Sequence, residues 1–391
     1  MHLLMIIPCL AMGGAEWAFV RLANALADTP HRVTCYVPYI CDSSPSLVEA
    51  MNPRVRVVNL PFMTSFLHRV IYKLSQKIPF IGLEQVMHSM ILRVLHHQDA
   101  FDVVNPHLHS GTMIACTAFQ HSSVPIIETD HGDYALIMKE DPSLNRLRLP
   151  QQRLDGMVCL SRPNEARIRS LSWKPGFRTA IIPNAAPQIT PSAPQRDYQP
   201  FTFGLVSRGI ADKGWAEALA AFRLLQTQVT TPMRLVFVGE GPEIQRLKKE
   251  VAPDESVVFA GHQSDPADWV SRFDVGLLPS CFTAESLPNV IIECQLQGKP
   301  VIATHIGGIP EMLEHQDRPC GILIPISPAT GRADVPSLAT AMQRLMQDSQ
   351  FHSACTTTAH EASARYSPQS CAAAYSDFFT AVTHYSRHGT Q

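Results

Sequence analysis

Short apolar runs alternate with helical patterns along almost the whole chain. Most of the runs are continuously apolar, which is typical of strands that are buried on both faces. The predicted strands are 3–8, 32–37, 55–60, 102–105, 124–129, 156–160 and 179–182 in the first half, and 201–206, 234–238, 257–260, 275–278, 300–303 and 321–324 in the second. Strands that alternate with helices favour parallel sheets, so the sequence predicts an α/β protein with two doubly wound sheets.

A proline-rich stretch separates the two halves. Its sequence, PNAAPQITPSAPQRDYQP, interrupts regular structure between the last strand of one half and the first strand of the other. The predicted divisions are an N-terminal domain over 1–183, a linker over 184–200, a C-terminal domain over 201–365 and a helical terminal segment over 366–391.

Length and composition agree with two globular domains. A chain of 391 residues exceeds the about 250–300 residues that one hydrophobic core usually supports. With 45% hydrophobic and 17% charged residues, disorder is not expected. The formal charge of −2, from 32 Lys and Arg against 34 Asp and Glu, provides no basic field for nucleic acid. We therefore expect no nucleic-acid partner.

Cysteine spacing and the N-terminal residues bear on the compartment. The ten cysteines include no C-x-x-C pair and no histidine at zinc-ligand spacing, which indicates reduced thiols. The apolar start, 1–12, lacks a basic segment and suits a buried strand better than a signal peptide. No apolar run reaches the roughly 18 residues of a membrane span. We expect a cytoplasmic protein, with peripheral attachment to the inner face of a membrane left open.

The segment Glu285-Ser-Leu-Pro-Asn-Val-Ile-Ile-Glu293 is the most informative one. Pro288 suits the first turn of a helix, so that Glu285 precedes the helix and Glu293 lies on it. Free backbone amides at Asn289 and Val290 would form an anion site. Five residues of helix span roughly 7.5 Å, comparable with the reach from a diphosphate to its ribose, and a carboxylate there can accept two hydroxyl hydrogen bonds. A bare pair of glutamates is nevertheless more often two solvated side chains.

Two other loops follow predicted strands at the edge where open α/β sheets bind ligands. Arg208 and Lys213 follow the strand 201–206 and can together grip both phosphates of a nucleoside diphosphate. Gly13 and Gly14 follow the first strand of the chain, where the absence of Cβ lets the backbone approach a ligand. Each pair alone also fits an ordinary surface turn.

These segments occur in the order and spacing of one family, together with Ile182-Pro-Asn184, Val238-Gly-Glu-Gly-Pro242 and Gly307-Gly-Ile-Pro-Glu311. The sequence resembles the retaining glycosyltransferase family 4, the glycosyl transferases group 1, over nearly its whole length. The resemblance implies a GT-B fold, in which two Rossmann-like domains face each other across a cleft. It also implies that the C-terminal helix, predicted over 368–382, crosses back to the first domain instead of capping the second.

The resemblance also implies roles for single residues. Glu293 would hold the donor ribose, Arg208 and Lys213 the diphosphate, and Glu285 a hydroxyl of the donor sugar. Fixed cations would oppose the negative charge on the leaving phosphate. Neither a metal nor another cofactor is expected, since the family usually manages without a divalent ion. The expected donor-binding residues are Gly13, Gly14, Arg208, Lys213, Glu285, Leu287, Pro288, Asn289 and Glu293.

Histidines of the first half are further candidates. The segment Thr129-Asp-His131-Gly132 ends a predicted strand. By the resemblance, His131 matches an active-site histidine that would bond the donor sugar near its C6 hydroxyl or help to polarise the acceptor. His107 and His109 follow another strand, and one of them is expected on the acceptor side, without a choice between the two. The expected catalytic residues are His131, Glu285, Arg208 and Lys213.

The stretch 63–98 mixes apolar and basic residues at helical spacing. Such a segment could lie on anionic lipid and collect a lipid-linked acceptor. A two-helix insert packed on the first sheet is the somewhat more frequent explanation of this pattern.

The sequence thus predicts a retaining, metal-independent glycosyltransferase. It would move a sugar from a nucleoside diphosphate sugar to a saccharide or lipid-linked acceptor, in surface polysaccharide, lipopolysaccharide or glycolipid assembly. An epimerase or hydrolase acting on nucleotide sugars and a non-catalytic nucleotide-sugar-binding protein are the alternatives. A nicotinamide dehydrogenase is disfavoured, because Gly239-Glu-Gly241 does not continue to a complete G-x-G-x-x-G.

Overall fold

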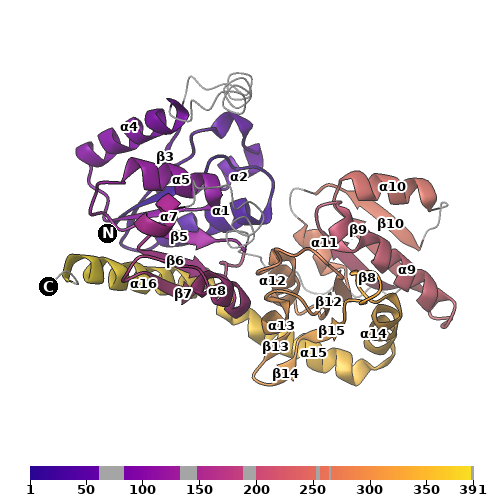
Figure 1. Ribbon diagram of the computed structural model, residues 1–391. Coiled ribbons are helices and arrows are strands. Elements are labelled where there is room, and N and C mark those ends of the chain that lie inside the picture. Colours follow the sequence, from indigo (N-terminus) through magenta and orange to yellow (C-terminus); the bar gives the residue numbers. More distant parts are fainter. Residues whose placement is uncertain (61–82, 133–147, 188–199, 252–255, 264–265, 389–391) are drawn as a thin grey trace. The chain divides into compact units, whose positions relative to one another are not determined.

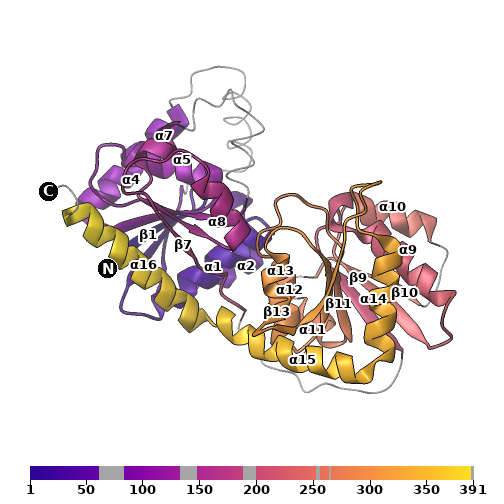
Figure 2. The same cartoon turned by 60° about the horizontal axis from the view of Figure 1, so that its bottom comes forward.

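The structure is a computed structural model that describes residues 1–60, 83–132, 148–187, 200–251, 256–263 and 266–388. The chain folds as two compact units (Figures 1 and 2). Unit 1 consists of Met1–Ala185 and Ser367–Gln391, and unit 2 of Ala186–Tyr366. Most of the predicted linker, and residues 63–82 of the predicted membrane-contact stretch, lie outside the described residues.

Unit 1 is built on parallel strands. They are β1 (His2–Ile6), β2 (Arg32–Tyr36), β3 (Arg56–Val58), β4 (Val103–Pro106), β5 (Ile127–Asp130), β6 (Gly156–Cys159) and β7 (Arg178–Ile181). They form sheets in the orders β3-β2-β1-β4 and β5-β6-β7, which parallel bridges connect at Val104 to Ile126 and at His107 to Thr129. The direction of the strand order reverses between β1 and β4. The loops after these two strands therefore flank the point where such sheets bind ligands.

Helices cover both faces of this sheet, because β1 is apolar and buried along its whole length. Leu3 and Met5 pack in one buried cluster with α1 (Gly14–Ala27) and α16 (Pro368–His388), whereas Leu4 and Ile6 pack in another with α4 (Leu83–Gln98) and α5 (Leu108–Ala118). The helices of unit 1 are α1 (Gly14–Ala27), η1 (Ile40–Asp42), α2 (Pro45–Glu49), α4 (Leu83–Gln98), α5 (Leu108–Ala118), α7 (Arg148–Arg153), α8 (Arg162–Arg169) and α16 (Pro368–His388).

The C-terminal helix α16 belongs to unit 1. Its side chains Tyr375, Phe379 and Val382 are buried in the cluster that also contains Phe19 of α1. Further along α16, the ring centroid of Tyr385 lies 4.3 Å from the guanidinium carbon of Arg178 in β7. The helix is longer than the predicted 368–382 and brings residues from the end of the chain next to the N-terminal sheet.

Unit 2 repeats the same architecture. Its parallel strands are β8 (Phe201–Val206), β9 (Met233–Val238), β10 (Val257–Gly261), β11 (Val275–Leu278), β12 (Val301–Thr304) and β15 (Gly321–Ile324), in the order β10-β9-β8-β11-β12-β15. Its helices are η3 (Ala211–Lys213), α9 (Trp215–Gln226), α10 (Pro242–Glu250), α11 (Ala267–Ser271), α12 (Asn289–Leu296), α13 (Ile309–Met312), α14 (Val335–Gln347), α15 (Ser349–Ser363) and η4 (Ala364–Tyr366). The loops after β8 and β11 flank the reversal of strand order.

The predicted α/β fold is confirmed, with differences at single elements. β5 begins at Ile127 rather than at 124, after Pro125, which has no backbone N–H to donate. The antiparallel pair β13 (Glu314–His315) and β14 (Arg318–Pro319) was not predicted, because two-residue strands show no periodicity. Its turn residues Gln316 and Asp317 have φ of 51° and 59°, as a tight hairpin turn of the mirror-image type requires.

Two findings bear on membrane insertion and on cysteine chemistry. None of the described helices is both long and apolar enough to cross a bilayer. All ten cysteines fall within the described residues, and none of them forms a disulfide.

Candidate functional site

Two glycine-containing loops of unit 2 touch backbone to backbone after β8 and β9. The N–H of Gly209 donates to the carbonyl of Glu240 over 2.7 Å, and the N–H of Glu243 donates to the carbonyl of Gly209 over 2.9 Å. A Cβ on Gly209 would come within 2.6 Å of the Glu240 backbone, so only glycine fits. This contact fixes the loop that carries the exposed side chain of Arg208.

Lys213 and Glu285 form a buried ion pair between two loops. Lys213 ends η3 after β8, whereas Glu285 lies between β11 and α12. Their exposed fractions are 8% and 5%. The ring centroid of Phe282 lies 4.5 Å from Lys213 Nζ and 5.9 Å from the guanidinium carbon of Arg208. Three predicted residues, Arg208, Lys213 and Glu285, therefore meet at one edge of the sheet.

Two hydroxyl groups that were not predicted hold this ion pair. Ser280 Oγ donates to Glu285 Oε1 over 2.8 Å, and Thr304 Oγ1 donates to the carbonyl of Ser280. Both side chains are fully buried. Ser280 follows β11 and Thr304 ends β12, so each is a polar residue at the carboxyl end of an apolar strand. That position is the sequence signal that could have identified them.

Gly307 has a structural role beside Glu285. Its φ of 51° is one that residues with a Cβ rarely adopt. A Cβ on Gly307 would lie 1.7 Å from the carbonyl oxygen of Glu285. Glycine at this position lets the loop after β12 close against the backbone of Glu285.

The helix α12 follows directly after this loop. The sequence placed Pro288 in the first helical turn, but Pro288 precedes α12 with φ of −62° and ψ of 117°. The N–H of Ile291 donates to the Pro288 carbonyl over 3.0 Å, so the helix begins with the amide of Asn289. Leu287 is buried, and Glu293 lies on α12 with a partly exposed side chain. The predicted anion site at this N-terminus stays a prediction.

Gly13 and Gly14 lie at the start of α1 in unit 1. Gly13 precedes the helix with φ of −158°, an extended conformation that any residue adopts. A Cβ there would meet only the carboxylate of Glu16, the end of a flexible side chain. The backbone of unit 1 therefore gives no reason for a glycine at position 13, and close approach of a ligand stays a prediction.

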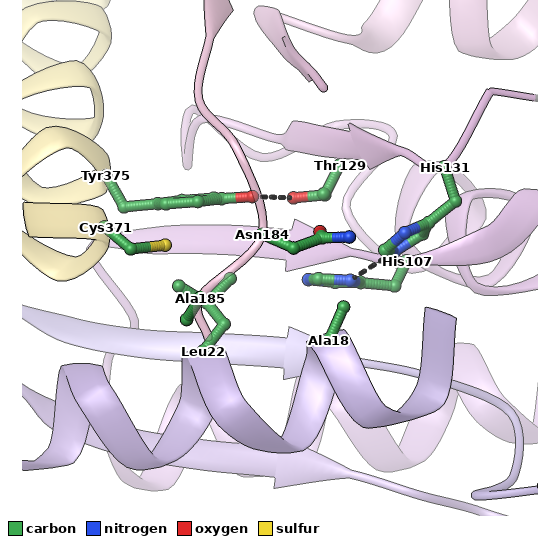
Figure 3. A pocket seen from close by; sticks show the side chains of 9 residues that line it. All are labelled: Ala18, Leu22, His107, Thr129, His131, Asn184, Ala185, Cys371 and Tyr375. Atoms are coloured by element: carbon green, nitrogen blue, oxygen red, sulfur yellow. Dashed lines mark hydrogen bonds between the residues drawn. The ribbon is translucent and has the colours of Figure 1, made fainter. Parts of the chain in front are cut away.

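Two of the candidate histidines of unit 1, His107 and His131, form part of a hydrogen-bond chain (Figure 3). His107 Nδ1 lies 3.0 Å from His131 Nε2, and His107 Nε2 lies 2.9 Å from Asn105 Oδ1. Asn105 Nδ2 donates to Thr129 Oγ1 over 3.1 Å. The hydroxyl of Thr129 lies 3.2 Å from that of Tyr375 on α16. The chain thus connects the C-terminal helix to His131.

The two histidines that the sequence left open have different surroundings, and the acceptor-side assignment stays a prediction. His107 is only 1% exposed and contacts His131, whereas His109 is half-buried in the first turn of α5. Asn105 and Thr129 were not predicted as site residues. Both are polar residues within short buried strands, which is the only sequence signal they offer.

Burial keeps both histidines neutral at ordinary pH. It lowers the pKa of His131 to about 4, and burial together with the His131 ring holds the pKa of His107 well below the usual 6.5. Since the folded-state values lie below the unfolded value, the unfolded chain takes up protons first as the pH falls. The folded protein therefore has its full unfolding free energy, as far as these two histidines are concerned, above about pH 6.5, and it loses part of it as the pH falls towards about 4.

We expect the double variant His107→Gln/His131→Gln to lose less stability on acidification than the wild type. Each histidine adds at most about 1.4 kcal/mol per pH unit to the loss of unfolding free energy, and the partly exposed His131 adds less. Urea unfolding at about pH 7.5 and about pH 5 measures the difference, since the first value lies above the pKa of an unfolded histidine and the second lies between that pKa and the lowered pKa of the folded state. His121→Gln, at an exposed position, is the control. Equal losses in the wild type and the double variant would contradict the assignment.

Two family models match the chain. The model described as Glycosyltransferase Family 4 matches residues 12–187, and the model described as Glycosyl transferases group 1 matches residues 200–348. Together they cover most of the sequence.

Individual proteins are similar over most of their length. The chain is 24% identical to the N-acetyl-alpha-D-glucosaminyl L-malate synthase of Bacillus anthracis, over 88% of this chain and 87% of that protein. It is 27% identical to the D-inositol 3-phosphate glycosyltransferase of Pseudarthrobacter chlorophenolicus, over 78% of this chain and 76% of that protein. The structure superposes on the crystal structure of Anabaena Alr3699/HepE in complex with UDP and glucose with a TM-score of 0.74. The two proteins are 18% identical, and the match covers 97% of this chain and 99% of that one. With its two-domain α/β fold and both family matches, this chain belongs to the family 4, group 1 glycosyltransferases.

Proposed function

We propose that unit 2 binds a nucleoside diphosphate sugar through Arg208, Lys213 and Glu285, and that the protein transfers this sugar to an acceptor hydroxyl with retention of the anomeric configuration. The observation that supports this most is the buried Lys213–Glu285 ion pair beside the exposed Arg208. All three residues lie where the strand order of unit 2 reverses, the usual ligand position of such sheets.

The charges in this cluster suit departure of a diphosphate. Breaking the bond between C1 and the phosphate oxygen places negative charge on the phosphate and positive charge on C1. Arg208 and Lys213 are fixed cations that oppose the developing phosphate charge, and the first amides of α12 add their dipoles. We propose that these groups do what a divalent ion does elsewhere, so that the reaction needs no metal or other cofactor.

Glu285 suits recognition of the donor sugar. Lys213 and Ser280 both bond its Oε1. We propose that Oε2 accepts a hydrogen bond from a hydroxyl of the sugar. A carboxylate oriented in this way lies close to the cations without acting as a nucleophile, which agrees with attack and departure on one face of the sugar. The donor phosphate would then assist deprotonation of the acceptor.

The acceptor is proposed to be a saccharide or lipid-linked saccharide of surface polysaccharide, lipopolysaccharide or glycolipid assembly. Met90 and Val94, one turn apart on α4, are 63% and 55% exposed and flank Arg93. Exposed apolar side chains beside a cation favour contact with an anionic membrane surface. Sedimentation with phosphatidylglycerol vesicles tests this: Met90→Ser/Val94→Ser should weaken binding, and unchanged binding would remove the support.

Calorimetry with UDP, GDP and ADP tests the donor proposal, with UDP first because the Anabaena protein contains it. We expect one diphosphate to bind and its sugar nucleotides to support transfer, with the anomeric coupling of the product matching that of the donor. Inverted coupling would contradict retention. Release of free sugar without an acceptor would favour a hydrolase, and no binding of any diphosphate would contradict the proposal.

Glu293→Gln is expected to weaken binding of the nucleoside diphosphate by about tenfold. The neutral amide still accepts from the ribose hydroxyls but more weakly: a hydrogen bond to a neutral group contributes about 0.5–1.5 kcal/mol and one to a charged group about 1.5–3 kcal/mol, a difference of about 1–1.5 kcal/mol. Calorimetric affinity is the measurement, with Glu250→Gln at an exposed position of α10 as the control. Unchanged affinity together with reduced turnover would show that Glu293 does not hold the ribose.

A further inference from the structure

The position of one carbonyl group fixes the orientation of the Asn105 amide. One atom of that amide lies 2.6 Å from the carbonyl oxygen of Ile127. A backbone carbonyl only accepts hydrogen bonds, so this atom is the Nδ2 amino group. The other atom, Oδ1, therefore faces His107 Nε2 at 2.9 Å.

The amide orientation determines where both imidazoles carry their protons. Because Oδ1 of Asn105 only accepts, His107 donates through Nε2–H. His107 is neutral, so its Nδ1 has a lone pair and accepts the bond from His131. His131 must then carry its proton on Nε2, which leaves a lone pair on its Nδ1. The Ile127 carbonyl thus determines the orientation of Asn105, Asn105 determines the tautomer of His107, and His107 determines that of His131.

On this geometry, and resting on the proposed glycosyl transfer, we propose that Asn105 and His107 are positioning residues that hold His131 in its Nε2–H tautomer, so that Nδ1 of His131 accepts a hydrogen bond from a substrate hydroxyl. A histidine that accepts at this atom selects ligands with a hydroxyl donor and fixes the direction of that O–H bond. If either ring adopted the other tautomer, His131 would carry its proton on Nδ1 and would present an N–H to the substrate instead of a lone pair.

The surroundings keep this arrangement rigid. The ring of Phe19 stands edge-on to that of His107, with centroids 4.9 Å apart and planes at 87°. Leu108, the next residue, has φ of 61°, a left-handed conformation that is unfavourable for a residue with a Cβ. The His107 N–H donates to the Ile6 carbonyl of β1 over 2.8 Å. Strained backbone beside a fully buried histidine indicates that its position is maintained against a local preference.

The tautomers can be observed directly in the full-length protein. Long-range ¹⁵N–¹H correlation spectra of the chain with ¹⁵N-labelled histidine, recorded without ligand, distinguish Nε2–H, Nδ1–H and imidazolium rings. His107→Gln and His131→Gln assign the two resonances. We expect both rings to show the Nε2–H pattern at neutral pH. An Nδ1–H or imidazolium pattern at either ring would overturn the proposal, whatever the variants do.

Asn105→Leu tests whether Asn105 sets the tautomer. We expect His131 to lose its single Nε2–H pattern and to show both tautomers. Tyr375→Phe removes only the last hydroxyl of the chain and should leave both rings unchanged. His88, a buried histidine bonded to Tyr36 and Tyr39, is the internal reference for intact folding. A pure Nε2–H pattern at His131 in Asn105→Leu would exclude a positioning role.

Sugar nucleotides test the second half of the proposal. UDP-glucose, GDP-mannose and ADP-glucose are each titrated against the parent diphosphate. We expect the Nδ1 resonance of His131 to move with the sugar nucleotide that binds and not with its diphosphate. Saturation without such a shift would show that Nδ1 accepts no substrate hydroxyl. If none of the three binds while the tautomers are as expected, the proposed function fails and the tautomer assignment stands.

Discussion

Lys213→Ala is expected to lower kcat by about 10²- to 10³-fold, the usual effect of losing one preorganised electrostatic donor. Lys213 ends η3 beside Glu285 and is 8% exposed, so its charge is held in a fixed position from which water is largely excluded. Turnover with the donor identified by calorimetry is the measurement. Lys249→Ala, on the exposed end of α10, is the matched control. Wild-type turnover in Lys213→Ala would contradict the diphosphate site.

The burial of Lys213 adds a second expected effect. Removing one partner of a buried ion pair leaves the other charge without compensation, which costs about 3–5 kcal/mol. Lys213→Ala should therefore also lower the urea midpoint of unit 2. Lys213→Met combined with Glu285→Gln removes both charges and should recover most of the stability while turnover stays low. Recovery of turnover together with stability would mean that the pair is structural only.

Gly214→Ala is expected to disrupt the same site through the backbone. Gly214 has φ of 79°, and an added Cβ would lie 2.0 Å from the carbonyl oxygen of Pro279. Alanine would force the loop of Lys213 away from the loop after β11, on which Glu285 lies. We expect a loss of more than about 2 kcal/mol in unfolding free energy and loss of nucleoside diphosphate binding.

A second glycine separates backbone strain from steric clash. Gly331 has a similar φ of 65°, but nothing lies within 4 Å of the position of its Cβ. Gly331→Ala should therefore cost only about 1 kcal/mol and leave diphosphate binding intact. Similar losses in both variants would show that the close approach of Gly214 to Pro279 is unimportant. Urea unfolding and calorimetry measure both properties.

Local periodicity was sufficient for the architecture. Continuous apolar runs such as LLMII at the start of the chain can be buried only between two helical layers, so the strands and their parallel pairing followed from the sequence. The loops with Arg208, Lys213 and Glu285 followed as well, because carboxyl ends of parallel strands meet at one edge. These residues are indeed adjacent in unit 2.

The partners of these residues depend on contacts that no local pattern encodes. Lys213 and Glu285 are separated by 72 residues, and the family resemblance assigned them to different parts of a ligand rather than to each other. Ser280 and Thr304 complete the cluster only because β11 and β12 are neighbours in the sheet. Hydrogen bonds between strands are set by the order in which the strands pair, which periodicity leaves open.

The histidine chain shows the same division. The sequence by itself determined that His107, His109 and His131 follow strands at the ligand-binding edge of unit 1. Only the tertiary structure decided that His107 contacts His131, because β4 and β5 are adjacent and Leu108 turns the backbone between His107 and His109. Thr129 meets Tyr375 across 246 residues of sequence. A contact over that separation depends on where α16 packs, which follows from burial of its apolar face in unit 1 and not from any local property of either residue.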